Sequence, residues 1–115
     1  MILLVDGIDM SKAYLFDVIT PLGYPVHCTA SYWVFVSTVK HPSLNGHLKD
    51  VEETLRDPDE IRRSRKDSNV FLFYKGQHPR WLCAVAKQED GTGFLITAYH
   101  TDLIKVGDVI WTKSK

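Results

Sequence analysis

His41 is the residue best placed for acid–base chemistry among the five histidines of the chain. It directly precedes Pro42, and proline is favoured at the first position of a helix, so the sequence places His41 at or beside a helix N-terminus. The positive end of the helix dipole disfavours an imidazolium there and favours a neutral ring that can accept a proton. The alternative interpretation is a surface histidine in a turn.

A second group of candidates is the basic cluster in the stretch DPDEIRRSRKD, residues 57–67: Arg62, Arg63, Arg65 and Lys66. Strand alternation places Arg62 and Ser64 on one face, and Ile61 with Arg63 and Arg65 on the other. If Ile61 faces the core, both arginines cannot follow it unless the strand ends or bulges. The planar guanidinium group matches phosphate oxygens, which makes Arg62 and Arg65 candidates for a phosphate site. The alternative is a charged edge strand that resists aggregation.

Two hydroxyl side chains, Thr97 and Tyr99, lie two residues apart in the segment GFLITAY, residues 93–99. Alternation predicts that they share a face with Leu95, opposite Phe94, Ile96 and Ala98. Such a pair can hydrogen-bond a phosphate, although both residue types are also common in half-exposed strands.

Several kinds of chemistry have no support in the sequence. The histidines and cysteines form no HxH, HExxH or CxxC grouping, so neither a metal nor another cofactor is predicted. No glycine-rich phosphate loop or GxSxG elbow is present. Cys28 and Cys83 lie in the apolar segments PVHCTA and WLCAVA, which favours buried free thiols over a single disulfide.

The composition bounds the class of protein. The chain has 115 residues, and its 14 basic and 14 acidic side chains give a formal net charge of zero. No global field attracts nucleic acid or an anionic membrane, so any polyanion must bind at a local patch. The opening MILLVDG is too short for a signal peptide and carries an early aspartate, and no apolar run approaches the ~20 residues of a membrane span. We therefore expect a soluble cytoplasmic protein with no membrane partner.

The first half of the chain mixes strand and helix signals. Residues 2–5 and 13–19 are apolar and β-prone, and TPLGYP supplies a turn before VHC resumes an extended chain. Residues 29–40 are ambiguous, because their β-branched and aromatic content favours a strand while Thr29 could cap a helix. Residues 42–56 predict a helix that ends at Asp57–Pro58, with Gly46 as its weak point. Its apolar face comprises Leu44, Leu48, Val51 and Leu55.

The second half predicts a regular antiparallel meander. Its strands are EIRRSR, VFLFYK, RWLCAVAK and GFLITAY, and IKVGDVIW is a further short candidate. We expect a single α+β domain over 1–115, divided into N-terminal strands and a turn (1–28), a helical region (29–56) and an antiparallel sheet (60–111).

The order of several segments resembles a known family. LGYPV, TASYW, KHPSL, ETLRDPDEI, LFY and FLITAY occur in an order similar to that of uncharacterised bacterial and phage domains of the barnase–EndoU–colicin–RelE nuclease superfamily. The resemblance covers residues 18–111. It implies N-terminal short strands and two helices packed on a four-stranded antiparallel sheet, with residues 29–40 helical and capped by Thr29.

The resemblance also implies a chemistry, the metal-independent cleavage of RNA by attack of a 2′-hydroxyl on the adjacent phosphate. His41 would be the general base or acid, Arg62 and Arg65 would contact the phosphate, and Thr97 and Tyr99 would hydrogen-bond it or carry a second proton. The implied substrate-binding residues are Ser64, Tyr74, Lys75 and His100. The chain departs from the family in having Ser43 after the His–Pro pair, where a glutamate is usual, and His100 where proline is frequent.

Two functions follow as hypotheses. The first is a ribonuclease, in the manner of a toxin that a cognate antitoxin or another protein partner neutralises. The alternative is a non-catalytic module that binds RNA or a protein, which the zero net charge favours. A small-ligand domain is a third reading, and no residue supports it.

Overall fold

The computed structural model describes residues 4–5, 8–9, 12–104 and 107–113. The short strands β1 (Leu4–Val5) and β2 (Ile8–Asp9) pair with each other. The main sheet contains β3 (Tyr14–Ile19), β4 (Pro25–Thr29), β5 (Glu60–Arg63), β6 (Val70–Gln77), β7 (Arg80–Glu89), β8 (Thr92–Thr101) and β9 (Asp108–Thr112). The helical segments are α1 (Ala30–Phe35), the π-helix η1 (Val36–Lys40), the 3-10 turn η2 (Pro42–Leu44) and α2 (Leu48–Arg56).

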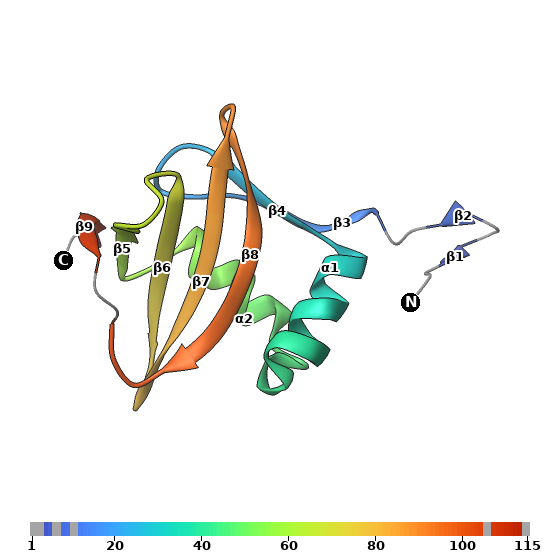
Figure 1. Cartoon of the computed structure of the whole chain (residues 1–115). Helices are drawn as coiled ribbons and strands as arrows, with labels where there is room; N and C mark the ends of the chain where they lie inside the picture. The colour runs from blue at the N-terminus through green and yellow to red at the C-terminus, as the bar shows by residue number, and fades with distance from the viewer. Residues whose placement is uncertain (1–3, 6–7, 10–11, 105–106, 114–115) are drawn as a thin grey trace.

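The sheet differs from the one that the sequence predicted. It has seven strands in the order β3-β4-β8-β7-β6-β5-β9, and it is mixed, because β4 runs parallel to β8 while the other neighbours are antiparallel (Figure 1). The expected barnase-like or RelE-like arrangement, a four-stranded antiparallel sheet under two packed helices, is therefore wrong. The reason is that the N-terminal hairpin and β9 extend the predicted meander at its two edges.

A close backbone approach lets the hairpin join the sheet. Within the described residues β4 and β8 share two paired positions, Val26 with Gly93 and His27 with Phe94. A Cβ atom placed on Gly93 would lie 2.9 Å from a ring carbon of Tyr24 and 3.2 Å from a methyl carbon of Val26. Glycine is therefore required where the two strands meet.

We expect Gly93→Ala to destabilise the fold by about 1–3 kcal/mol, because the added methyl group overpacks a buried junction. Urea unfolding followed by circular dichroism measures this loss. Thr92→Ala is the matched control, since its side chain is exposed one residue earlier on the same strand. Equal stability of the two variants would mean that β4 does not dock on β8 in this way.

The segment after β4 is helical, as the resemblance implied and contrary to its strand propensity. The Thr29 hydroxyl accepts a hydrogen bond from the backbone N–H of Tyr32 at 3.2 Å, which caps α1. The helix buries Trp33, and the following π-helix buries Val36. Packing of these residues against the core outweighs the modest strand preference of the segment.

The next predicted helix is interrupted. Residues 42–56 were expected to form one helix, but Gly46 has φ +87° and separates η2 from α2. The apolar face is nevertheless as expected, because Leu44, Val51 and Leu55 are buried and Leu48 packs against the core. His41 therefore precedes one 3-10 turn and not a long helix, so the helix-dipole argument for a neutral ring loses its basis.

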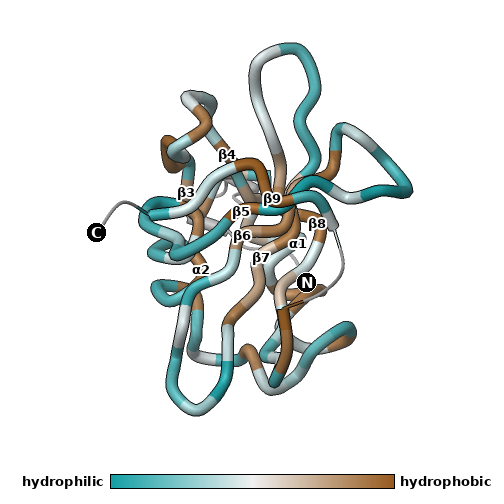
Figure 2. The backbone as a smooth tube through the Cα atoms, turned by 90° about the vertical axis from the view of Figure 1, so that its left-hand side faces the viewer, coloured by the Kyte–Doolittle hydropathy of each residue, from teal (hydrophilic) through white to brown (hydrophobic). Residues whose placement is uncertain are grey.

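The core lies between the sheet and α2. This helix contacts β3 as well as β6 and β7, so the sheet curls around it (Figure 1). The largest fully buried apolar side chains include Phe73, Leu44, Leu55, Ile61, Leu82 and Leu95. Figure 2 shows hydrophobic strand segments near the centre of the molecule and hydrophilic loops at its periphery. The candidate site lies on the opposite face of the sheet, where Tyr74 and Cys83 are also fully buried.

Candidate functional site around His41 and Tyr99

A bulge in β8 sets the geometry of the site. Val85 of β7 pairs with Thr97 and the next residue, Ala86, pairs with Leu95, which leaves Ile96 as the extra residue. The sequence had placed Leu95 on the same face as Thr97 and Tyr99. The bulge moves Leu95 to the core face beside Ala98, while Thr97 and Tyr99 stay together on the opposite face.

The bulged residue presents its carbonyl oxygen to the helical segment. The Tyr32 hydroxyl donates a hydrogen bond to the Ile96 carbonyl, and the Lys40 Nζ donates to the same oxygen at 3.3 Å. The α1–η1 segment therefore covers the edge of β8 that β4 leaves unpaired. These contacts fix Lys40, and with it the adjacent His41, beside the strand.

His41 packs against Tyr99. The centroids of the two rings are 5.7 Å apart with an interplanar angle of 39°, and the His41 side chain keeps partial exposure to solvent. A partly exposed imidazole held against a strand by an aromatic ring can exchange protons with a bound substrate. Lys40, the residue before His41, forms no ion pair within the part of the chain that the structure describes. Its positive charge at the Ile96 carbonyl is therefore not neutralised by a carboxylate there.

The Tyr99 hydroxyl belongs to a buried polar cluster. Burial raises the pKa of Tyr99 above its ordinary value, and interactions with the Cys83 thiol and the Tyr74 hydroxyl raise it further. Tyr74 and Cys83 are themselves fully buried and pair with each other across β6 and β7. The phenol therefore keeps its proton, and its hydroxyl interacts with protein groups. His41 contacts the ring of Tyr99.

Two other buried groups, Cys28 and Tyr24, also have a pKa that burial raises. Burial raises the pKa of both Cys28 and Tyr24 to about 12, from ordinary values of 9.0 and 10.0. At a pH between the ordinary pKa and the raised pKa, the unfolded chain loses a proton that the folded chain retains. The free energy of unfolding therefore falls as pH rises through this range. We expect unchanged stability below pH ~8 and, above pH ~10, a loss of about 1.4 kcal/mol per pH unit from each group, which is about 3 kcal/mol per pH unit from Cys28 and Tyr24 together.

Urea unfolding at a series of pH values measures this dependence, and Tyr24→Phe isolates one contribution. The Tyr24 hydroxyl is buried with no hydrogen-bond partner among the described residues, so removing it should cost little at pH 7. The variant should then lose less stability than the wild type above pH ~10. The same alkaline slope for both proteins would contradict the assignment.

Thr97 is the other hydroxyl on this face. Its Oγ1 atom is buried and has no hydrogen-bond partner within the described part of the structure. An unsatisfied buried hydroxyl costs roughly 1–3 kcal/mol, so a ligand oxygen that reached it would be favoured. Thr97 lies two residues from Tyr99 on the same face, next to the bulge.

The arginines lie elsewhere. The register connects Arg62 through Leu72 and Val85 to Thr97, so Arg62 shares the face of Thr97, but three strand spacings, about 14 Å, separate the two backbones. The Arg62 guanidinium pairs with Glu60 and also donates to the Gly107 carbonyl. The strand ends at Arg63, which resolves the conflict with alternation.

The other arginine and the adjacent serine have local roles. Arg65 is exposed and pairs with Asp108 at 3.1 Å. The Ser64 hydroxyl accepts a hydrogen bond from the Lys66 backbone N–H at 3.2 Å, within the turn that follows β5. Both contacts lie in the β5–β9 region and not with the residues that surround His41.

Lys75 and His100 lie on the side of the sheet that faces α2. The Lys75 Nζ donates to the Asp57 carbonyl at 2.7 Å and so ties the end of α2 to β6. The His100 ring is 5.4 Å from that of His47 and 3.2 Å from the Gln77 side-chain oxygen. Burial lowers the pKa of His100, as do the positive charges of His47 and Arg80. His100 therefore does not share a face with Tyr99.

Among the described residues, no three His, Cys, Asp or Glu side chains gather in a way that could hold a metal ion. The helices of the described ranges are all too short or too polar to cross a membrane. Cys28 and Cys83 are free and buried, as their apolar surroundings predicted.

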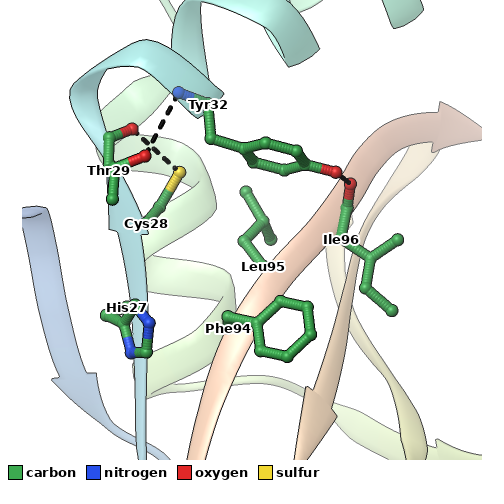
Figure 3. A pocket seen from close by; sticks show the side chains of 7 residues that line it. All are labelled: His27, Cys28, Thr29, Tyr32, Phe94, Leu95 and Ile96. Atoms are coloured by element: carbon green, nitrogen blue, oxygen red, sulfur yellow. Dashed lines mark hydrogen bonds between the residues drawn. The ribbon is translucent and has the colours of Figure 1, made fainter. Parts of the chain in front are cut away.

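A cavity of about 360 Å³ opens where β4 and β8 diverge (Figure 3). The rings of His27, Tyr32 and Phe94 line it, together with Leu95 and Ile96. Figure 3 shows Tyr32 extending across the opening to the Ile96 carbonyl, so the cavity adjoins the bulge that holds Lys40.

Comparison of the chain with protein-family models, curated proteins and solved structures found no match. These findings do not indicate membership of the barnase–EndoU–colicin–RelE superfamily. Any functional conclusion must therefore rest on the residues of this chain.

Two features of the site were missed by reasoning from the sequence. Lys40 was visible in the segment KHPSL but was not singled out, and its adjacency to His41 was the available signal. The cavity had no local signal, because its walls come from β4, α1 and β8, which are far apart along the chain.

Proposed function

We propose that the protein is a metal-independent ribonuclease whose catalytic base is His41. The observation that supports this proposal is the placement of a partly exposed imidazole against Tyr99, with the ammonium group of the preceding residue, Lys40, held at the Ile96 carbonyl of the same strand. Cleavage of RNA at a phosphate is promoted by a proton acceptor and by a positive charge that stabilises the phosphorane, and the two residues supply these groups along one strand.

The reaction assigns one role to each group. His41 takes the proton of a ribose 2′-hydroxyl while that oxygen forms a bond to the adjacent phosphorus. The bond between phosphorus and the 5′ oxygen breaks, and the imidazolium returns its proton through water to that oxygen. The products are a 2′,3′-cyclic phosphate and a 5′-hydroxyl. Lys40 offsets the charge that accumulates on the phosphate, and Tyr99 positions the imidazole.

The arrangement of the arginines favours a second candidate, a module that binds RNA without cleaving it. Arg62 and Arg65 each pair with a carboxylate, and neither is shown near His41, so the predicted catalytic set is incomplete. Lys40 and the aromatic side chains could hold a single strand without chemistry.

Incubation of the purified protein with single-stranded RNA in EDTA tests the proposal. We expect fragments that end in a 2′,3′-cyclic phosphate, which mass spectrometry identifies. Intact RNA, together with a gel shift that weakens as salt is raised, would establish the binding module instead. Intact RNA with no gel shift would exclude both.

RNA as substrate implies a cytoplasmic protein, and two buried free thiols suit such a reducing compartment. An unregulated ribonuclease would damage its host, so the proposal also includes an inhibitory protein partner, in the manner of an antitoxin. Co-purification of the chain with such a partner from its native host would test this part of the proposal.

A further inference from the structure

We propose that the cavity between β4 and β8 binds one base of the RNA single strand that the His41 site acts on. This inference rests on the proposed function and extends it to a base-binding subsite. The cavity volume of about 360 Å³ lies at the lower end of the range for small-molecule sites.

The lining suits a flat, aromatic group. His27, Tyr32 and Phe94 contribute ring surfaces, while Cys28 and Leu95, both almost fully buried, form its apolar inner wall. Bases of single-stranded RNA bind proteins by stacking on such side chains. A charged or strongly polar ligand would gain little here.

The polar groups of the cavity are mostly engaged, with one exception. The Thr29 hydroxyl caps α1, and the Tyr32 hydroxyl donates to the Ile96 carbonyl. The His27 ring stacks on Tyr14 at 4.3 Å between centroids, and no hydrogen bond of its nitrogens occurs within the described residues. His27 can therefore hydrogen-bond the edge of a base, which a purely apolar partner would not use.

The cavity and the His41 site are joined through the bulge. Ile96 forms part of the cavity, and its carbonyl oxygen receives hydrogen bonds from both Tyr32 and Lys40. Phe94, Thr97 and Tyr99 follow one another along β8, and Ile96 and Tyr99 are about 10 Å apart at the rise of a strand. A short RNA strand lying along β8 would thus place a base in the cavity and a phosphate near Lys40 and His41.

Titration of the isotope-labelled protein with adenosine, guanosine, cytidine and uridine, followed by NMR, tests the cavity without using a phosphate. We expect shifts of the backbone amides of Cys28, Leu95 and Ile96 with at least one nucleoside. Phe94→Ala should weaken that binding by about tenfold or more, because it removes a stacking surface. Trp81→Ala is the control, since Trp81 is a partly exposed aromatic residue on a strand that does not line the cavity.

The outcomes separate this proposal from the ribonuclease proposal. If RNA is cleaved but no nucleoside shifts these amides, the base subsite is wrong and the ribonuclease stands. Nucleoside binding in the cavity without RNA cleavage would support the subsite and contradict the ribonuclease. Should Phe94→Ala fail to fold, Phe94→Leu replaces it, because leucine keeps apolar bulk without a stacking face. A tryptophan-containing peptide that shifts the same amides, when no nucleoside does, would overturn the subsite in favour of a protein ligand.

Discussion

Replacing His41 by alanine should lower the rate of RNA cleavage by about 10²-fold or more while leaving RNA binding nearly unchanged. General acid–base catalysis by a positioned side chain contributes roughly 10²–10⁴-fold, and alanine removes the proton acceptor. The rate of appearance of 2′,3′-cyclic phosphate ends measures the effect, and fluorescence anisotropy with labelled RNA measures binding.

His78→Ala is the matched control, because His78 is an exposed histidine in the turn between β6 and β7. Its cleavage rate should equal that of the wild type. Equal rates for His41→Ala and the wild type would remove His41 from the mechanism and leave the binding module as the remaining function.

Tyr99 provides a further distinction within the same experiment. Its ring contacts His41, whereas its hydroxyl interacts with Cys83 and Tyr74. Tyr99→Phe should therefore keep most of the activity and the same pH profile, while Tyr99→Leu should reduce the rate because the imidazole loses its support. A loss of activity in Tyr99→Phe as large as that in His41→Ala would show that the hydroxyl itself carries a proton, as the resemblance implied.

The second large effect is expected at Leu44. This side chain is fully buried in η2, three residues after His41 and four before α2 begins. Leu44→Ala should reduce the free energy of unfolding by about 2–5 kcal/mol, because the lost apolar contacts leave a cavity. The catalytic rate should fall as well, even at a temperature where the variant is folded, since the turn that carries His41 loses its anchor.

Val39→Ala is the control for this substitution. Val39 lies in η1 on the other side of His41, and its side chain is 67% exposed. We expect its stability to remain within about 0.5 kcal/mol of the wild type. A loss below about 1 kcal/mol for Leu44→Ala would mean that η2 is not packed into the core as described.

The sequence by itself determined features that depend on near neighbours. The cap at Thr29, the apolar face of Leu44, Val51 and Leu55, and the shared face of Thr97 and Tyr99 all follow from spacings of a few residues. These patterns reflect the periods of helices and strands, which are fixed by local backbone geometry. The sequence also singled out His41 as a candidate for acid–base chemistry, although the helix expected after it proved to be a single turn.

Only the tertiary structure decided the rest, because it depends on contacts between distant segments. The pairing of Val26 with Gly93 joins residues that are far apart in the chain. The local sequence indicates this pairing only by the glycine itself, and a glycine at that position is equally typical of a turn. The bulge at Ile96 reverses the alternation that the sequence predicted for Leu95. The acidic partners of Arg62 and Arg65 neutralise a cluster that looked available for phosphate. Strand order, bulges and ion pairs depend on packing across the whole sheet. The position of Lys40 and the cavity near it could therefore be seen only in the structure, where β4, α1 and β8 lie side by side.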